Sequence, residues 1–93
     1  MNNVVSDEKL AHYFSVTQRA LDMAQSAPVV DVASVEIILD MVSRYVSDAQ
    51  HFAKKGDLVL AFAALNYAHG WLDCGARLGL FVVRDSTLFT VDE

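Results

Sequence analysis

The sequence is poor in residues that cross-link a chain or bind metals: it has one cysteine, Cys74, and three histidines among 93 residues. A single cysteine excludes a disulfide within the chain and agrees with a reducing compartment, so we expect a cytoplasmic protein. The cysteine and the histidines do not have the spacing of a zinc site. We therefore expect neither a metal ion nor another cofactor.

Positive charge is also scarce, since 7 lysine and arginine residues stand against 12 aspartate and glutamate residues, for a formal net charge of −5. Nucleic acids and membrane surfaces bind broad basic patches, so we expect neither as a partner. Charged residues make up only 20 % of the chain and hydrophobic residues 54 %. A small domain of this composition is expected to bury apolar surface against another chain, which predicts a homo-oligomer or a protein partner.

Long hydrophobic runs are absent as well. The longest uninterrupted apolar run, Leu58–Leu65, is far shorter than the roughly 18 residues that a membrane-spanning helix needs. Asp73 and Arg77 interrupt the mostly apolar sequence that follows it. The N-terminus has neither the basic region nor the apolar core of a secretory signal. These absences predict a soluble protein without a transmembrane segment.

The residues that are present fit one helical domain, residues 1–93. Hydrophobic residues recur at intervals of three and four in three segments, which predicts helices at about residues 7–25, 32–54 and 58–81. Pro28 lacks a backbone N–H donor and interrupts the pattern between the first two segments.

The pair Gly56-Asp57 is the sharpest break in the helical pattern. Glycine suits the left-handed residue that ends a helix, and Asp57 can accept from the free N–H groups of the next one, so the flanking helices should form an antiparallel hairpin. We predict an all-α fold, a three-helix antiparallel bundle with a short extended C-terminal arm at residues 82–93. Thr87–Val91 are β-forming residues, and the arm has two possible sites, its own bundle or a second chain.

The third predicted helix is apolar around most of its circumference, which is typical of a helix that is central in a bundle or buried in an oligomer. We expect one of its apolar faces to form an interface through Tyr67, Trp71, Leu78 and Phe81. A glycine inside a helix costs about 1 kcal/mol relative to alanine. We therefore expect that close packing explains the three glycines of this segment, Gly70, Gly75 and Gly79.

A mixed polar edge lies on the same predicted helix. His69, Asp73 and Arg77 recur every four residues, with Asn66 and Tyr67 beside them. A carboxylate one turn away can orient a histidine, and an arginine can contact a phosphate, so this edge is a candidate binding site for a small molecule or nucleotide. The structural alternative, which we favour, is a solvated stripe in which an Asp73–Arg77 ion pair holds the tail.

Tyr45, Asp48 and Tyr67 form a second group. Tyr45 precedes Gly56 by eleven residues and Tyr67 follows it by eleven, so the two tyrosines should lie at similar heights on neighbouring helices. A tyrosine hydroxyl bonded to a buried carboxylate would give both groups a partner. We therefore assign structural roles to four residues: Tyr45, Asp48, Gly56 and Asp57.

Arg44 and His51 are separated by six residues and share a helix face, which resembles the motif of the helical HEPN ribonucleases. That resemblance implies an RNA-cleaving enzyme. Two residue types at a loose spacing also match by chance. Tyr45, which stands where the motif has a polar residue, falls on the core side of the predicted helix.

A longer resemblance is carried by the segment Tyr67-Ala68-His69-Gly70-Trp71-Leu72-Asp73, together with Arg77 and Gly79 and, upstream, Tyr45, Asp48, Phe52, Gly56-Asp57 and Ala61. With these residues the chain resembles an archaeal family of small proteins known as domain of unknown function 357. The resemblance covers the second and third predicted helices well, and the first by length and position. It implies a compact helical bundle in an archaeal cytoplasm, but no activity, substrate or catalytic residue. Cys74 stands where the family has a small residue such as alanine.

Two classes of function remain. We favour a helical interaction module that homo-oligomerises or docks a partner helix through an apolar face of the third helix. The alternative is a domain that binds a small molecule, nucleotide or phosphate at the edge formed by His69, Asp73 and Arg77, or an RNA-processing enzyme. Because no residue pattern points firmly to a catalytic group, we favour a protein without enzymatic activity.

Overall fold

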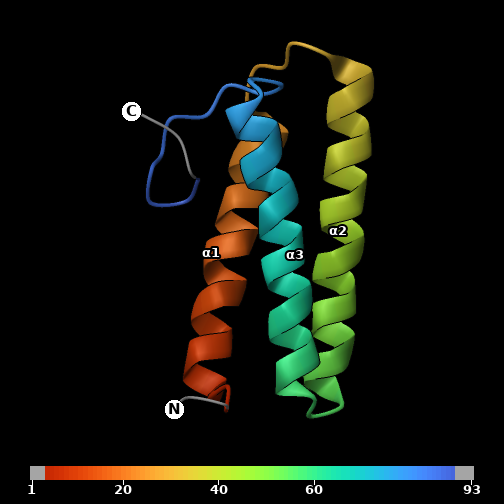
Figure 1. Ribbon diagram of the computed structural model, residues 1–93, viewed down its shortest axis with the longest axis vertical. Coiled ribbons are helices and arrows are strands. Elements are labelled where there is room, and N and C mark those ends of the chain that lie inside the picture. Colours follow the sequence, from red (N-terminus) through yellow and green to blue (C-terminus); the bar gives the residue numbers. More distant parts are fainter. Residues whose placement is uncertain (1–3, 90–93) are drawn as a thin grey trace.

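The computed structural model describes residues 4–89, which form three helices packed side by side along their length (Figure 1). The helices are α1 (Asp7–Ser26), α2 (Val32–Lys54) and α3 (Leu58–Arg77). α2 runs antiparallel to the other two, and α3 packs against both of them. The prediction of an all-α three-helix bundle is confirmed, and the described residues contain no strand.

Each helix begins at a side chain that accepts a hydrogen bond from its free first turn. Ser6 accepts from the Lys9 N–H at 3.1 Å, Asp31 from the Ser34 N–H at 3.2 Å, and Asp57 from the Leu60 N–H at 3.1 Å. Such N-caps satisfy donors that have no partner within the helix. Gly56 has a φ of +79°, so it ends α2 in the left-handed conformation that glycine adopts without strain. The predicted α2–α3 hairpin is confirmed.

The prediction that the third helix continues to Phe81 is wrong, because α3 ends at Arg77. Gly79 has a φ of +72° and leaves the helix in the left-handed conformation. The Leu80 N–H then donates to the Gly75 carbonyl at 3.0 Å, and the Gly79 N–H donates to the Ala76 carbonyl at 3.1 Å. This closing pattern is typical of a glycine just past a helix end. Gly79 therefore serves the helix terminus and not close packing.

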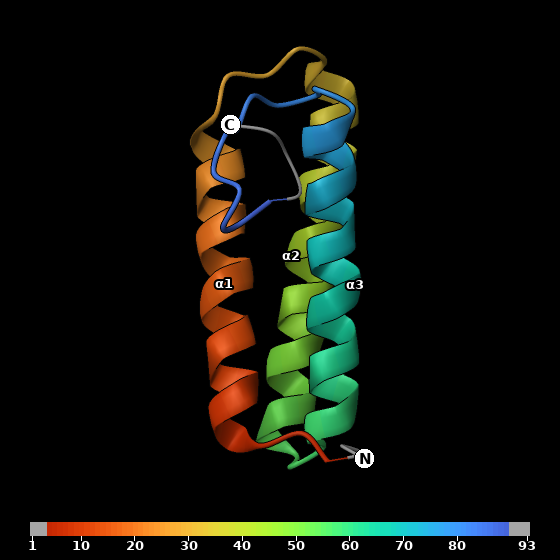
Figure 2. The same ribbon diagram turned by 60° about the vertical axis from the view of Figure 1, so that its left-hand side comes forward.

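After α3 the chain turns back over its own bundle and lies beside the α1–α2 connection. Phe81 pairs with Val29 in one antiparallel bridge, and the Val82 N–H donates to the Pro28 carbonyl at 2.9 Å. The described part of the arm then runs over the space between α1 and α3 (Figure 2), where Leu88 and Phe89 are buried. The arm, whose site the sequence leaves open, thus packs on its own chain.

The β-forming segment Thr87–Val91 does not extend as a strand over its described residues. Instead, residues 86–89 form a turn in which Asp85 accepts from the Thr87 N–H and from the Thr87 hydroxyl. Residues 90–93 of the predicted arm lie outside the described part of the chain.

Two clusters of buried side chains hold the bundle together. The cluster near the arm includes Leu21, Val42, Leu72 and Phe81, and the cluster near the α2–α3 hairpin includes Leu10, Ala49, Ala61 and Leu65. Over residues 4–89, no helix combines the length and the apolar character that crossing a membrane requires.

Candidate functional site

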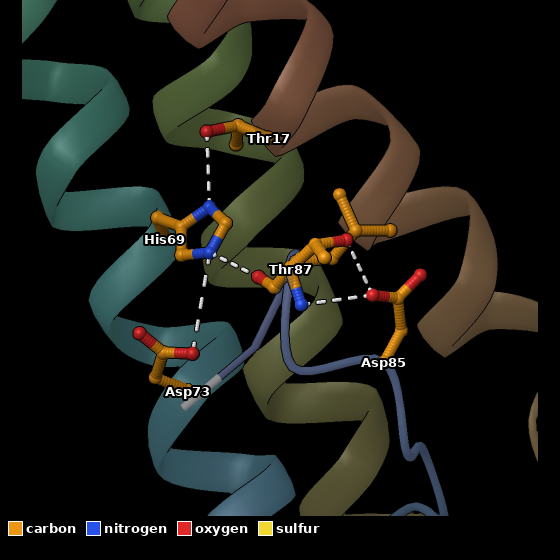
Figure 3. A network of polar contacts seen from close by, with 6 residues as sticks. Thr17, His69, Asp73, Asp85 and Thr87 are labelled. Carbon is orange, nitrogen blue, oxygen red and sulfur yellow. Dashed lines mark hydrogen bonds and ion pairs between the residues drawn. The ribbon is translucent and has the colours of Figure 1, made fainter. Parts of the chain in front are cut away.

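His69 lies at the centre of a polar network that joins α3 to α1 and to the arm (Figure 3). Its Nε2 atom lies 2.6 Å from the carbonyl oxygen of Leu88, and its Nδ1 atom lies 3.2 Å from the hydroxyl oxygen of Thr17. Because a carbonyl can only accept, Nε2 must carry the proton, and Nδ1 of the neutral ring then accepts from the Thr17 hydroxyl. Both ring nitrogens therefore have partners within the chain.

Thr17 and Asp73 complete this network. Thr17 is only 1 % exposed, so its hydroxyl depends on the bond to His69. An Asp73 carboxylate oxygen lies 4.0 Å from His69 Nε2, and both side chains are partly buried. Among the described residues, no buried side-chain nitrogen or oxygen lacks a partner. The network connects three segments that are far apart in sequence.

Asp85 fixes the turn that presents Leu88 to His69. The hydroxyl and backbone N–H of Thr87 both donate to its carboxylate, and these bonds lower the pKa of Asp85 below the usual 3.8. The Asp31 cap has a lowered pKa for the same reason, since the backbone N–H and then the hydroxyl of Ser34 donate to it. Both carboxylates are built into the framework of the chain.

The predicted edge of His69, Asp73 and Arg77 is therefore divided by the fold. His69 and Asp73 are partly buried beneath the arm, whereas Arg77 is exposed in the last turn of α3. Asn66, also predicted to bind a ligand, is exposed. Asn66, His69 and Asp73 line one side of a depression of about 240 Å³ between α1 and α3, with Tyr13, Val16 and Gly70.

The predicted bond between a tyrosine hydroxyl and a buried Asp48 is wrong, because Asp48 is exposed. The expected juxtaposition of the two tyrosines is confirmed: the rings of Tyr45 and Tyr67 meet edge to face with their centroids 4.5 Å apart. Tyr67 also meets Trp71 edge to face, at 6.2 Å. The tyrosines join α2 to α3 through their rings, and Asp48, one turn along α2, faces water.

Arg44 and His51 do not form a shared site among the described residues. Arg44 is bound to Asp40 one turn earlier on α2, at 2.8 Å, and both side chains are well exposed. His51 is also exposed, and its ring contacts the neighbouring Phe52. Over residues 4–89 no group of three histidine, cysteine, aspartate or glutamate side chains is placed to hold a metal ion.

α3 carries an apolar surface that the other described residues leave largely exposed. Tyr67 is 51 % exposed, Leu60 46 % and Leu78 68 %, while Trp71 is partly covered. Residues spaced by three and four positions share one side of a helix. We call this surface the α3 face and define it by Leu60, Ala63, Tyr67, Gly70, Trp71, Cys74 and Leu78.

Phe81 does not belong to this surface, contrary to the sequence prediction. Because the chain leaves α3 at Gly79, Phe81 turns into the core, where it is 0 % exposed and contacts Phe89 with ring centroids 6.3 Å apart. It also lies against Gly75, where an added Cβ would be 2.5 Å from Phe81 Cε1. Close packing therefore explains Gly75, as expected from the sequence.

Gly70 has no such explanation within the described residues. No atom of residues 4–89 lies within 4 Å of the place that its Cβ would occupy. It lies beside a shallow apolar depression of about 360 Å³ lined by Asn66, Tyr67, Trp71 and Cys74. Sequence reasoning did not assign Ala63 and Gly70 to the interface, although their helical spacing from Tyr67 was available as a signal. Gly70 thus leaves a gap in the surface at the middle of the α3 face.

Residues 12–81 of the chain match the family described as "Protein of unknown function (DUF357)". This match spans most of the chain, so the protein belongs to that family. No curated protein and no solved structure gave a match. The matched region includes about three quarters of α1 and all of α2 and α3, and it ends at Phe81, where the arm enters the core.

Proposed function

We propose that this protein is a helical interaction module that binds another polypeptide through the α3 face. The observation that carries the proposal is the exposure of Leu60, Tyr67 and Leu78 along one side of a single helix. Scattered exposed apolar residues are normal in soluble proteins, but a continuous apolar surface is typical of an interface. Aromatic side chains such as Tyr67 and Trp71 are also enriched at such surfaces.

The shape and charge of the α3 face support the same function. From Leu60 to Leu78 it runs about 27 Å along the helix, at 1.5 Å per residue. None of its seven residues is charged, although the exposed Arg77 flanks it three positions after Cys74, so a partner that covers the centre of the face meets no ion there. The face therefore fits an elongated apolar partner, such as a helix, better than a compact ligand.

The alternative function, a small-molecule or phosphate site at His69, Asp73 and Arg77, has less support. A ligand that used the His69 ring would have to replace its bonds to Thr17 and Leu88. Those bonds hold the arm on the bundle, so ligand binding there would oppose folding of the arm. The exposed Arg44–Asp40 pair gives the RNA-processing alternative no enclosed site.

A photo-cross-linking experiment in the cells that produce the protein tests the proposal. A benzophenone amino acid replaces Ala63 on the α3 face or, as a matched control, Ala11; both are exposed helical alanines. We expect a discrete covalent adduct to another polypeptide from position 63 and none from position 11. Absence of an adduct at position 63, or equal labelling at both positions, would overturn the proposal.

A further inference from the structure

We propose that the part of the bundle on which the arm packs, between α1 and α3, is a peptide-binding site that a segment of another polypeptide enters in place of the arm. We call it the arm site. It is separate from the α3 face, so the inference goes beyond the function proposed above. Three observations carry it: the few contacts that hold the described end of the arm, the self-contained turn formed there, and the extent of the family match.

The arm site binds the end of the described arm through two buried side chains and one carbonyl (Figure 3). Leu88 is 6 % exposed and Phe89 is 3 % exposed, and both belong to the buried cluster that includes Leu21 and Leu72. The Nε2–H of His69 donates to the Leu88 carbonyl at 2.6 Å. None of these contacts depends on the covalent link between the arm and α3.

The segment bound at the arm site satisfies backbone donors of its own. The N–H groups of Leu88 and Phe89 both donate to the Asp85 carbonyl, at 3.2 and 2.9 Å. The N–H and the hydroxyl of Thr87 donate to the Asp85 carboxylate. These four bonds close a turn that offers the site two apolar side chains and the Leu88 carbonyl. A separate peptide with the same residues can form the same turn.

Between its two anchors the arm is a short tether. The first anchor lies at the α1–α2 connection, where the Val82 N–H donates to the Pro28 carbonyl, and the second is the turn. Four of the six residues from Val82 to Thr87 are exposed. A short tether holds its end at an effective concentration of about millimolar. A segment of another polypeptide that binds the arm site tightly enough to exceed this advantage therefore displaces the arm.

The extent of the family match separates the arm site from the segment that occupies it. The match covers residues 12–81, so it includes Thr17, His69 and Leu72. It stops before the turn that begins at Asp85. The site therefore lies in the part of the chain that the family shares, whereas its occupant lies outside that part. This division is expected of a site that takes segments of different origin.

The bound turn also defines the chemistry of the ligand. The bonds from Thr87 are the main cause of the lowered pKa of Asp85, and the positive charge of Arg19 on α1 lowers it further. Arg19 therefore favours an acidic residue at the start of the turn. The arm site fits a segment with an acidic residue, a hydroxyl residue two positions later and two large apolar residues directly after it.

NMR titration of the full chain with a synthetic peptide of residues 84–89 tests the proposal. In the variant Leu88→Ser/Phe89→Ser the arm remains but lacks both buried side chains, so the arm site is open. We expect the peptide to shift the amide signals around Thr17 and His69 in this variant. Wild type should need at least about tenfold more peptide for the same shifts, because its tethered arm competes.

A second variant covers the case in which the first does not fold, which the same spectra report. Asp85→Ala/Thr87→Ala weakens the turn of the arm but keeps both buried side chains, and the peptide should bind it more tightly than wild type. The signals of the exposed Ala11 are the internal control and should not move.

Three results would overturn the proposal. One is a folded variant whose arm-site signals respond to the peptide no more than those of wild type. Another is an equal response to a peptide with serine in place of its leucine and phenylalanine. The third is wild type that dimerises without peptide by exchanging arms, since the occupant would then be a second copy and not a separate partner.

Discussion

At the scale of single residues, His69 joins the arm to two helices through hydrogen bonds of its side chain. It is the point where α1, α3 and the arm share hydrogen bonds, through Thr17 Oγ1 at 3.2 Å and the Leu88 carbonyl at 2.6 Å. The local sequence around His69 favours a polar edge that faces water, because its neighbours Asn66 and Arg77 are polar and exposed. The fold instead partly buries His69, because the Thr17 hydroxyl and the Leu88 carbonyl both require a hydrogen-bond partner.

Replacement of His69 by alanine should therefore destabilise the protein by about 1–3 kcal/mol, because the Thr17 hydroxyl and the Leu88 carbonyl lose their partner in a buried setting. Urea unfolding followed by circular dichroism measures this loss. His12→Ala is the matched control: His12 is exposed on α1, and its replacement should change the free energy of unfolding by less than about 0.5 kcal/mol. Equal effects of the two substitutions would show that the His69 network contributes nothing.

At the scale of elements, the two glycines of α3 and the one just past its end have three different roles. Gly75 makes room for Phe81, Gly79 ends the helix, and Gly70 faces open space. The sequence suggests one purpose, close packing, for all three glycines. The structure instead shows packing at Gly75, helix termination at Gly79 and a gap in the surface at Gly70. These different roles depend on where the chain turns after Arg77. The turn is held by backbone hydrogen bonds that join Leu80 and Val82 to Val30 and Pro28.

The same substitution at two of these glycines should have opposite effects. Gly75→Ala places a methyl group against the buried ring of Phe81, and we expect a net loss of about 1–2 kcal/mol because overpacking outweighs the gain in helix propensity. Gly70→Ala adds its methyl group in open space, so the dilute chain should gain about 0.5–1 kcal/mol. Chemical denaturation at low protein concentration measures both.

The sequence predicts the starts of the helices well, because each start depends on a cap within three residues of it. Ser6, Asp31 and Asp57 all act as such caps. It predicts the end of α3 poorly, since the apolar spacing continues through Leu78 to Phe81 and conceals the left-handed conformation of Gly79. The candidate site also divides into local features, which the sequence predicts, and long-range features, which it does not. The grouping of Tyr67, Trp71 and Leu78 follows from their helical spacing. The burial of Phe81 and the hydrogen-bond partners of His69 depend on the arm, which packs against residues far from it in sequence.

At the scale of the whole molecule, the bundle buries its core on the inner side of α3 and leaves an apolar face on the outer side. The described part of the arm lies over the space between α1 and α3 (Figure 2), with Leu88 and Phe89 in the core, while Tyr67 and Leu78 of the α3 face are exposed. The chain therefore covers the space between α1 and α3 itself, whereas Tyr67 and Leu78 on the α3 face stay exposed, as the proposed interaction requires. The whole chain carries a formal net charge of −5, whereas the α3 face carries none.

Sedimentation of the protein in extracts of the cells that produce it tests binding through the α3 face most directly. We expect wild type to sediment as an assembly heavier than the 10.2 kDa of one chain, because another polypeptide covers the face. Ala63→Glu places a charge on the face and should sediment with the single-chain mass, while Ala11→Glu should sediment like wild type. A wild-type protein that sediments with the mass of one chain, or an Ala63→Glu variant that sediments like wild type, would contradict the account.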